Sequence, residues 1–446
     1  MFPHTQRLRA LVERVTSDGV LILSNPAERF RSRDTTFRYR ALSDILYLTG
    51  FREPEAILVV APGHDLGDTL LFVRPRDPEK EAWSGRRAGP EGAIAATGVD
   101  AALPLADFST HLPALLSDRS TVYFPAGESH PLEASLHAAC ATLDRRRPSA
   151  APTSIARPKD LLHAMRMLKD DHELSLMRRA AEISAEAHVL AMRACRPGMR
   201  EYELRALLEY HFLRSGAQAP AYETIVGAHD NATILHYVDT TDVLAPGDLV
   251  LIDAACECSG YAADITRTFP VCGSFSQAQR DVYDIVLAAQ EDAIAHVGPA
   301  VPLRDLQTRA HRALTQGLVD LGVLQGDIDA LLEDKAHAPY TLHSLGHWLG
   351  LDVHDVGAYY ESPDVSKPLR PRMVLTIEPG LYFPLRDPKV PEALRGIGVR
   401  IEDDILVTDQ GSENLTRTCP KAPDALEALI GTLDAIDVAL PTETGI

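Results

Sequence analysis

The chain has 446 residues, 45% of them hydrophobic, and a formal net charge of −19 at pH 7. This length is too great for one ordinary hydrophobic core, so we expect two domains, one of them large. The acidic balance argues against nucleic acid and anionic membrane surfaces as partners, because both require clustered cations. Neither a membrane-spanning apolar run nor a secretory signal pattern is visible, so we expect a cytoplasmic protein. The six cysteines show no disulfide framework and no paired C-x-x-C motifs.

The first 150 residues predict a mixed α/β unit. Short apolar runs, typical of strands, alternate there with helical or turn-rich stretches, and they cover residues 20–23, 56–60, 69–73 and 121–124. In the stretch RRRPSAAPTSIARPKD, which begins at Arg145, proline, serine and arginine replace the apolar periodicity, which indicates a linker. The expected domains therefore span residues 1–165 and 170–440.

The second domain is predicted to be α+β. Helical patterns cover residues 171–194, 200–213, 276–297 and 303–321, and the Pro197-Gly198 pair separates the first two. Strand candidates lie between and after these helices, at residues 249–254, 262–269, 373–378 and 399–407. These strands carry most of the polar residues that suggest chemistry.

The segment LVLIDAACECSGYAADITRTFP carries two aspartates, Asp253 and Asp264, on consecutive strand candidates. If the turn is centred between Cys258 and Ser259, the two aspartates lie equally far from it and oppose each other across a hairpin. Opposed like charges repel, and an unpaired buried carboxylate is costly, so a cation is expected between them. In the structural alternative, Asp253 caps a turn and Asp264 pairs with Arg267.

The segment TLHSLGHWLGLDVHD places His343, His347 and His354 within twelve residues of an otherwise apolar, glycine-punctuated stretch. Three histidines there are hard to explain as core filling, although any one of them could be a hydrogen-bonded core residue. Glu378 ends the apolar run in VLTIEPG, where Pro379 favours an extended backbone that projects the glutamate into a site.

In GIGVRIEDDILVT, period-two alternation places Glu402 on the same strand face as Arg400 and Asp404. The alternative is a surface ion pair of Arg400 and Glu402, worth about 0 to 1 kcal/mol. Taken together, two aspartates, two glutamates and one histidine form an oxygen-rich set that suits two ions such as Mn²⁺, Co²⁺ or Zn²⁺. Two such ions can share carboxylates and a bridging hydroxide.

These motifs resemble those of the pita-bread metallopeptidases and, within them, of the aminopeptidase P (Xaa-Pro aminopeptidase) family. The resemblance spans nearly the whole chain and rests on LIDAACECSGYAADITRTFP, ILHY, HSLGHWLGLDVHDVG, LTIEPGLYF and GVRIEDD, in the order that the family shows. RSRDTTFRYRALSDILYLTGFREPEAILVV and EAWSGRRAG match the N-terminal domain of the family. The resemblance implies an α+β fold, in which a smaller α/β domain precedes a pita-bread catalytic domain.

The resemblance also implies two divalent metal ions, with Mn²⁺ first and Co²⁺ or Zn²⁺ as alternatives. It assigns as their ligands Asp253, Asp264, His347, Glu378 and Glu402, with Asp264 and Glu402 bridging both ions. It gives catalytic roles to His236, His354, Glu378 and Arg400, and substrate contacts to His343, Tyr382, Asp34 and Trp83. Asp34 and Trp83 belong to the first domain and, in tetrameric relatives, reach the active site of a neighbouring subunit, so a homo-oligomer is expected.

The implied activity is removal of the N-terminal residue from peptides whose second residue is proline. A hydroxide that bridges the ions attacks the first carbonyl carbon, His236 or His354 stabilises the oxyanion, and Glu378 carries the proton to the proline nitrogen. An Xaa-Pro amide lacks an N–H, so the site needs a pocket shaped for the proline ring. His343, His354 and Tyr382 are candidates for its walls.

Three other functions share this fold. Prolidase has the same ligand set but cleaves only Xaa-Pro dipeptides, and the EAWSGRRAG segment favours aminopeptidase P over it. A non-catalytic peptide-binding module would have lost its metal ligands. Creatinase works without metals and lacks this set. All five ligand positions are intact, which argues against the last two functions.

Overall fold

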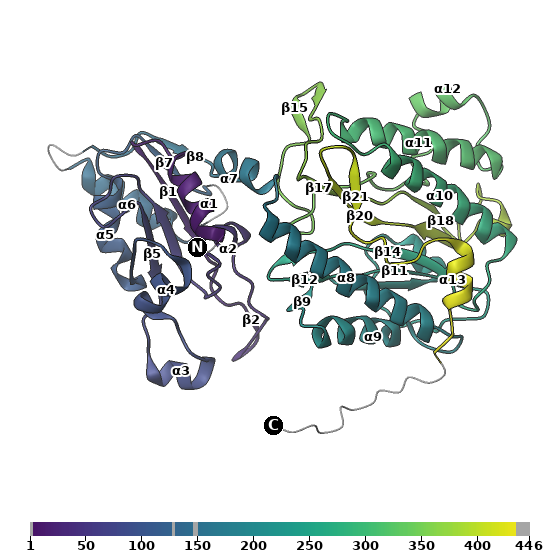
Figure 1. Cartoon of the computed structure of the whole chain (residues 1–446), viewed down its shortest axis with the longest axis horizontal. Helices are drawn as coiled ribbons and strands as arrows, with labels where there is room; N and C mark the ends of the chain where they lie inside the picture. Colours follow the sequence, from purple (N-terminus) through teal and green to yellow (C-terminus); the bar gives the residue numbers. More distant parts are fainter. Residues whose placement is uncertain (1–2, 127–129, 146–149, 434–446) are drawn as a thin grey trace. The chain divides into compact units, whose positions relative to one another are not determined.

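The computed structural model describes residues 3–126, 130–145 and 150–433. The chain forms two compact units and passes from the first to the second between Arg166 and Met167. Figure 1 shows the elements of both units. Among the described helices, none combines the length and the apolar composition that crossing a membrane would require. All six cysteines are free thiols.

The first unit contains a six-stranded sheet in the order β6-β5-β4-β1-β7-β8. One face of this sheet packs against the apolar sides of α5 and α6, and the four strand runs predicted from the sequence all lie in it. The strands of the unit are β1 (Gly19–Ser24), β2 (Phe30–Ser32), β3 (Thr35–Thr36), β4 (Ile57–Val60), β5 (Thr69–Val73), β6 (Ala101–Pro104), β7 (Thr121–Tyr123) and β8 (Ser154–Ala156). Its helices are α1 (Pro3–Val12), α2 (Ser43–Thr49), α3 (Pro78–Ser84), α4 (Gly89–Thr97), α5 (Phe108–Leu116), α6 (Glu133–Leu143) and α7 (Lys159–Arg166).

Part of the stretch predicted to be a linker is regular structure instead. Its residues Ser154–Ala156 form β8, which pairs in parallel with β7, and α7 begins at Lys159. β8 is a short edge strand whose Ile155 is 52% exposed, so it carries no apolar alternation that could have revealed it. The linker prediction is therefore wrong over these residues, while residues 146–149 lie outside the described part of the chain.

Four long helices of the second unit lie where the sequence predicts them. α8 begins with a capping box, in which the Asp170 and Glu173 side chains accept each other's backbone N–H groups. Ser276 and Gln279 form the same arrangement at the start of α10. These helices pack around the strands in a large core (Figure 1). The helices are α8 (Asp171–Ala194), α9 (Glu201–Arg214), α10 (Gln277–Ala295), α11 (Leu303–Asp320), α12 (Ile328–Glu333) and α13 (Pro423–Leu429).

The strands of the second unit form several small sheets. β11 lies between β10 and β14, β20 lies between β17 and β21, and β18 pairs with β19. Two predicted strands are divided: residues 262–269 between β13 and β14, and residues 399–407 between β19 and β20, which pair with different partners. The strands are β9 (Ala219–Pro220), β10 (Ile225–Ala228), β11 (Leu249–Asp253), β12 (Cys256–Cys258), β13 (Tyr261–Ala262), β14 (Thr266–Pro270), β15 (Tyr360–Ser362), β16 (Val365–Ser366), β17 (Val374–Ile377), β18 (Gly380–Phe383), β19 (Ile397–Arg400), β20 (Asp403–Val407) and β21 (Ser412–Asn414).

The hairpin that carries the two aspartates has a different register from the predicted one. Ser259 and Gly260 both have positive φ, 52° and 92°, as a two-residue type I′ turn requires. The turn is therefore centred one residue further along the chain than expected. Asp253 opposes Thr266, and Asp264 lies in the segment between β13 and β14. Direct opposition of the two aspartates was a wrong prediction.

Candidate metal centre and active site

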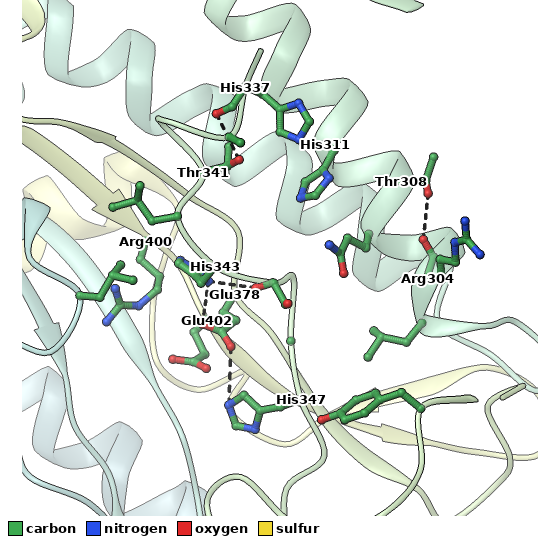
Figure 2. A pocket seen from close by; sticks show the side chains of 18 of the residues that line it. Arg304, Thr308, His311, His337, Thr341, His343, His347, Glu378, Arg400 and Glu402 are labelled. Atoms are coloured by element: carbon green, nitrogen blue, oxygen red, sulfur yellow. Dashed lines mark hydrogen bonds and ion pairs between the residues drawn. The ribbon is translucent and has the colours of Figure 1, made fainter. Parts of the chain in front are cut away.

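Polar side chains from several separate segments of the second unit line one cavity of about 1200 Å³. Strand ends deliver many of them: Asp253 ends β11, Glu378 follows β17 and Arg400 ends β19. Figure 2 shows side chains that converge on this cavity. It brings together nine of the residues that the sequence singles out, namely His236, Asp253, Asp264, His343, His347, His354, Glu378, Arg400 and Glu402.

Three predicted metal ligands, Asp264, His347 and Glu402, offer ligand atoms that all lie within 4.8 Å of one another. The Nε2 atom of His347 is 3.4 Å from Asp264 Oδ2 and 3.5 Å from Glu378 Oε1. Asp253 lines the same cavity and is 9% exposed. Four carboxylates and one imidazole thus line one cavity, and this donor set suits divalent ions. We refer to these five residues as the metal cluster.

The backbone orients the ring of His347. Its Nδ1 atom lies 3.0 Å from the carbonyl oxygen of Trp348, and a carbonyl can only accept, so Nδ1 carries the proton. In the neutral ring, the lone pair of Nε2 then faces the carboxylates, as metal ligation requires. Gly346 permits this placement, because a Cβ atom there would lie 1.9 Å from the carbonyl oxygen of Thr376 in β17.

Neighbouring side chains hold Asp253 and Glu402 in place. Tyr222 donates to Asp253 Oδ1 and Arg400 donates to Oδ2, each at 2.6 Å. Thr266 donates to Glu402 Oε2 at 2.7 Å and accepts from Arg400 Nε at 3.1 Å. Because Arg400 and Glu402 are 4% and 2% exposed, the surface ion pair considered for them is excluded.

A chain of hydrogen bonds connects Arg400, Tyr382 and His343. Arg400 Nη1 donates to the Tyr382 hydroxyl at 3.0 Å, and this hydroxyl lies 2.7 Å from His343 Nε2. His343 Nδ1 lies 2.9 Å from the carbonyl oxygen of Ser344, so Nδ1 donates and Nε2 accepts from Tyr382. Burial and the Arg400 charge lower the pKa of His343 to about 4, which keeps the ring neutral. Tyr382 is itself fully buried, so it acts on the cavity through His343 and Arg400.

In the metal-free protein, burial disfavours the charged forms of the metal cluster residues. It raises the pKa of Glu378 to about 7, and burial followed by the Asp264 charge raises that of Glu402 well above its usual range. Burial opposes a charge on His347, but the hydrogen bond to Asp264 and the nearby carboxylates outweigh it and raise the His347 pKa to about 9. Arg400 and His347 do not balance the four carboxylates, of which three are buried and Glu378 is half-buried, so the residues present fit a site for added positive charge.

Asp403, the residue after Glu402, has the opposite surroundings. Its carboxylate accepts hydrogen bonds from Arg267 at 2.7 Å and from Lys421 at 2.8 Å, and both Asp403 and Arg267 are fully buried. Burial alone would raise the pKa of Asp403, but the two cations hold it well below its usual range. The alternative pairing of Arg267 with Asp264 is therefore wrong. We refer to Arg267, Asp403 and Lys421 as the compensated cluster.

The remaining predicted residues lie in two places. His236 and His354 are exposed side chains that line the cavity, and the His354 ring packs edge-on against that of His347 with centroids 4.2 Å apart. Asp34 lies exposed in the turn between β2 and β3 of the first unit, and Trp83 lies in α3 with 93% of its surface exposed. The substrate contacts of Asp34 and Trp83 stay predictions.

The side chains that hold the metal cluster in place are not among the site residues predicted from the sequence. These include Tyr222, Thr266 and Asp404, whose carboxylate accepts the N–H of Asp264 at 3.1 Å. Thr266 follows Asp264 by two residues, a spacing that could have suggested it, whereas nothing near Tyr222 in the sequence points to the site. None of the residues predicted from the sequence lies on the side of the cavity that α11 and the loop after α12 form.

Two family models match the chain. Residues 4–123 match the aminopeptidase P N-terminal domain, and residues 175–409 match metallopeptidase family M24. The chain belongs to metallopeptidase family M24. As an M24 metallopeptidase it is a hydrolase, and the family implies binding of divalent metal, in agreement with the donor set described above.

Relatives of this M24 metallopeptidase cover nearly all of it. It is 45% identical over 428 residues to the Xaa-Pro aminopeptidase of Escherichia coli (strain K12), and the match covers 95% of this chain and 96% of the E. coli protein. It is 36% identical over 420 residues to Xaa-Pro aminopeptidase 3 of Homo sapiens, and the match covers 93% of this chain and 81% of the human protein. The structure of Pseudomonas aeruginosa aminopeptidase PepP matches with a TM-score of 0.93 and 42% identity, and the match covers 96% of this chain and 97% of PepP. The predicted pita-bread domain preceded by an aminopeptidase P N-terminal domain is confirmed.

Proposed function

We propose that this M24 metallopeptidase removes the N-terminal residue from peptides whose second residue is proline. The observation that carries the proposal is the metal cluster on one wall of the cavity, in a chain that is 45% identical along its length to an Xaa-Pro aminopeptidase. The domain bounds 1–165 and 170–440, the cytoplasmic location and the homo-oligomeric state stay predictions from the sequence.

The five residues of the metal cluster would hold two divalent ions. Mn²⁺ is the first candidate, and Co²⁺ or Zn²⁺ are alternatives, because the donor set is mostly oxygen with one imidazole. The chemistry that such ions supply is a water molecule whose pKa falls from 15.7 toward about 7, which makes it a nucleophile at neutral pH.

The protein side chains then move the proton and stabilise charge. Glu378 Oε2 lies 3.4 Å from His343 Nδ1 and its Oε1 lies 3.5 Å from His347 Nε2, which places this carboxylate inside the cavity wall. It takes a proton from the attacking water and delivers it to the departing proline nitrogen. His236 and His354 line the cavity and are assigned to hydrogen-bond the developing oxyanion.

The surroundings of His343 suit a proline in the second position. Both of its ring nitrogens are engaged in hydrogen bonds within the protein, to Ser344 and Tyr382. The neutral ring therefore offers the substrate a flat wall without a free donor. The proline nitrogen has no N–H to bind and carries an apolar ring instead, so such a wall is complementary to it.

The test compares release of glycine from Gly-Pro with release of the first residue from Xaa-Pro-Pro oligopeptides in metal-replete buffer. Release from the oligopeptides, by protein that contains about two ions per chain, supports the proposal. Cleavage of the dipeptide alone would assign prolidase activity instead. Cleavage of neither substrate by fully metallated protein would contradict both assignments.

A further inference from the structure

The cavity continues beyond the metal cluster into a region that we call the α11 arm. Its lining comes from Arg304, Thr308 and His311 of α11 and from Lys335 and His337 after α12. The cavity measures about 1200 Å³, which exceeds the roughly 300 to 1,000 Å³ of ordinary small-molecule pockets. It therefore has room for more of a peptide than the two residues that flank the scissile bond.

Two histidines of the α11 arm lie against each other, His311 from the helix and His337 from the loop (Figure 2). Their ring centroids are 4.5 Å apart. His337 is 6% exposed, and its Nδ1 atom has no hydrogen-bond partner among the described residues although the residue lines the cavity. Burying a polar atom without a hydrogen-bond partner is unfavourable. Its position here points to a ligand that supplies the missing partner.

The charges that line the cavity are divided between its two ends. All of the acidic lining residues belong to the metal cluster, whereas the α11 arm contributes the cations Arg304 and Lys335. The two histidines add no charge at neutral pH, because burial lowers the pKa of His311 to about 4 and also lowers that of His337. Once divalent ions offset the carboxylates of the metal cluster, Arg304 and Lys335 remain as the cations of the α11 arm, and a ligand that extends into this arm is favoured by an anionic group there.

We propose that the α11 arm binds the part of the peptide that follows the scissile bond and selects a carboxylate there. This carboxylate is either the C-terminus of a short oligopeptide or an acidic side chain of a longer one. The inference rests on the proposed function, which places the N-terminal residue at the metal cluster. The anionic end of the peptide then faces Arg304 and Lys335, and the peptide backbone supplies a partner for Nδ1 of His337.

The first experiment measures kcat/KM for matched peptide pairs. Ala-Pro-Ala-Ala is compared as free acid and as C-terminal amide, and Ala-Pro-Ala-Glu amide is compared with Ala-Pro-Ala-Gln amide. We expect a preference of about tenfold for the carboxylate in at least one pair, and the pair that shows it identifies the source of the carboxylate. The double variant Arg304→Gln/Lys335→Gln is expected to lose this preference.

Arg309→Gln is the matched control, because it removes the same charge from α11 at a residue that pairs with Asp292 at 2.8 Å and does not line the cavity. It is expected to keep the preference. Equal kcat/KM within both pairs for the wild type, or a preference that survives in the double variant, would overturn the inference and leave the proposed function intact. Failure to cleave any of the four peptides would overturn both.

A second variant tests the histidine pair. His337→Phe keeps a ring of similar size and removes the unpartnered nitrogen, so KM for the preferred tetrapeptide is expected to rise about fivefold or more while kcat stays near the wild-type value. A purely structural role would lower kcat and the melting temperature without this split. An unchanged KM would count against a contact of His337 with the peptide.

Discussion

Glu402 and Asp403 are consecutive residues, yet they belong to two buried charge clusters that differ in how their charge is balanced. Asp403 is neutralised by Arg267 and Lys421, and its pKa lies below the usual range. Glu402 lies among other carboxylates, and its pKa lies above the usual range. Both side chains are buried, so burial of charge does not by itself distinguish a structural group from a functional one. The distinction is whether the chain supplies the counter-charge itself.

Consecutive residues contribute to the two clusters not only at Glu402 and Asp403 but also at the residues that contact them. Thr266 and Arg267 are consecutive on β14, and they contact Glu402 and Asp403, respectively. Successive side chains of an extended backbone point to opposite faces, so adjacent residues are directed into different environments. One face becomes the wall of the cavity and the other becomes part of the core. Four predictions test this contrast, starting with the largest effect.

Glu402→Gln is expected to reduce kcat/KM by at least about a thousandfold, because it removes a carboxylate that is proposed as a ligand of both ions. In the metal-free protein at pH 7, the same change is expected to raise the free energy of unfolding. The pKa of Glu402 is raised in the folded state, so this residue lowers the free energy of unfolding at pH values above the usual pKa of a glutamate. Glutamine does not ionise and therefore removes this unfavourable contribution.

Activity assays in metal-replete buffer check the first part of this prediction, and urea denaturation in the presence of a chelator checks the second. Asp264→Asn is the companion variant and is expected to lose activity in the same way. Turnover near the wild-type value for either variant in metal-replete buffer would exclude the assigned role.

Asp403→Asn is expected to lower the free energy of unfolding by about 3 to 5 kcal/mol, because Arg267 then stays buried without its charge partner. The Asp403 contribution is present at neutral pH and is lost as pH falls through its lowered pKa. The midpoint of urea denaturation in chelator measures the change, beside that of Glu402→Gln. A loss below about 1 kcal/mol would remove the contrast between the two clusters.

Metal affinity is expected to fall as pH falls, and to fall more steeply below about pH 7. In the free site the pKa of His347 is about 9, that of Glu378 is about 7 and that of Glu402 is raised well above its usual range. An incoming ion therefore displaces the His347 proton below pH 9 and the Glu378 proton as well below pH 7, in addition to the proton that Glu402 holds. Each displaced proton raises the apparent Kd about tenfold per pH unit.

Competition with a chelator of known affinity between pH 6 and 8.5, at roughly half-unit steps, measures this slope. Glu378→Gln is the control, because it removes the group that titrates near pH 7 and so removes the increase in slope. An affinity that does not change over this range would show that the cluster holds no protons for a metal to displace.

Arg178→Ala is expected to change the free energy of unfolding by less than about 1 kcal/mol. Arg178 Nη2 lies 2.7 Å from Glu413 Oε2, the same separation as in the Arg267–Asp403 pair, but the two side chains are 45% and 35% exposed. Solvent screens an exposed pair, and each partner is hydrated when the other is removed. A loss above about 2 kcal/mol would show that contact distance matters more than burial.

Local patterns predicted the elements of this protein better than their pairing. The four long helices of the second unit and four strands of the first, β1, β4, β5 and β7, lie where the apolar pattern places them. The aspartate hairpin was displaced because Ser259 and Gly260 take the positive φ of a type I′ turn, one residue beyond the expected centre. β8 escaped notice because a short, exposed edge strand has no alternation to read.

The sequence by itself indicated the chemistry of the site: candidate donor side chains stand at or near the ends of apolar runs, and the resemblance of their motifs to a known family selects among them. Only the tertiary structure decided which acids keep an uncompensated charge. Arg267 reaches Asp403 across 136 residues of sequence, and the histidines of the α11 arm come from a helix and a loop 26 residues apart (337 − 311). The energy of a buried charge depends on the groups that folding places around it, and those groups are distant in the sequence.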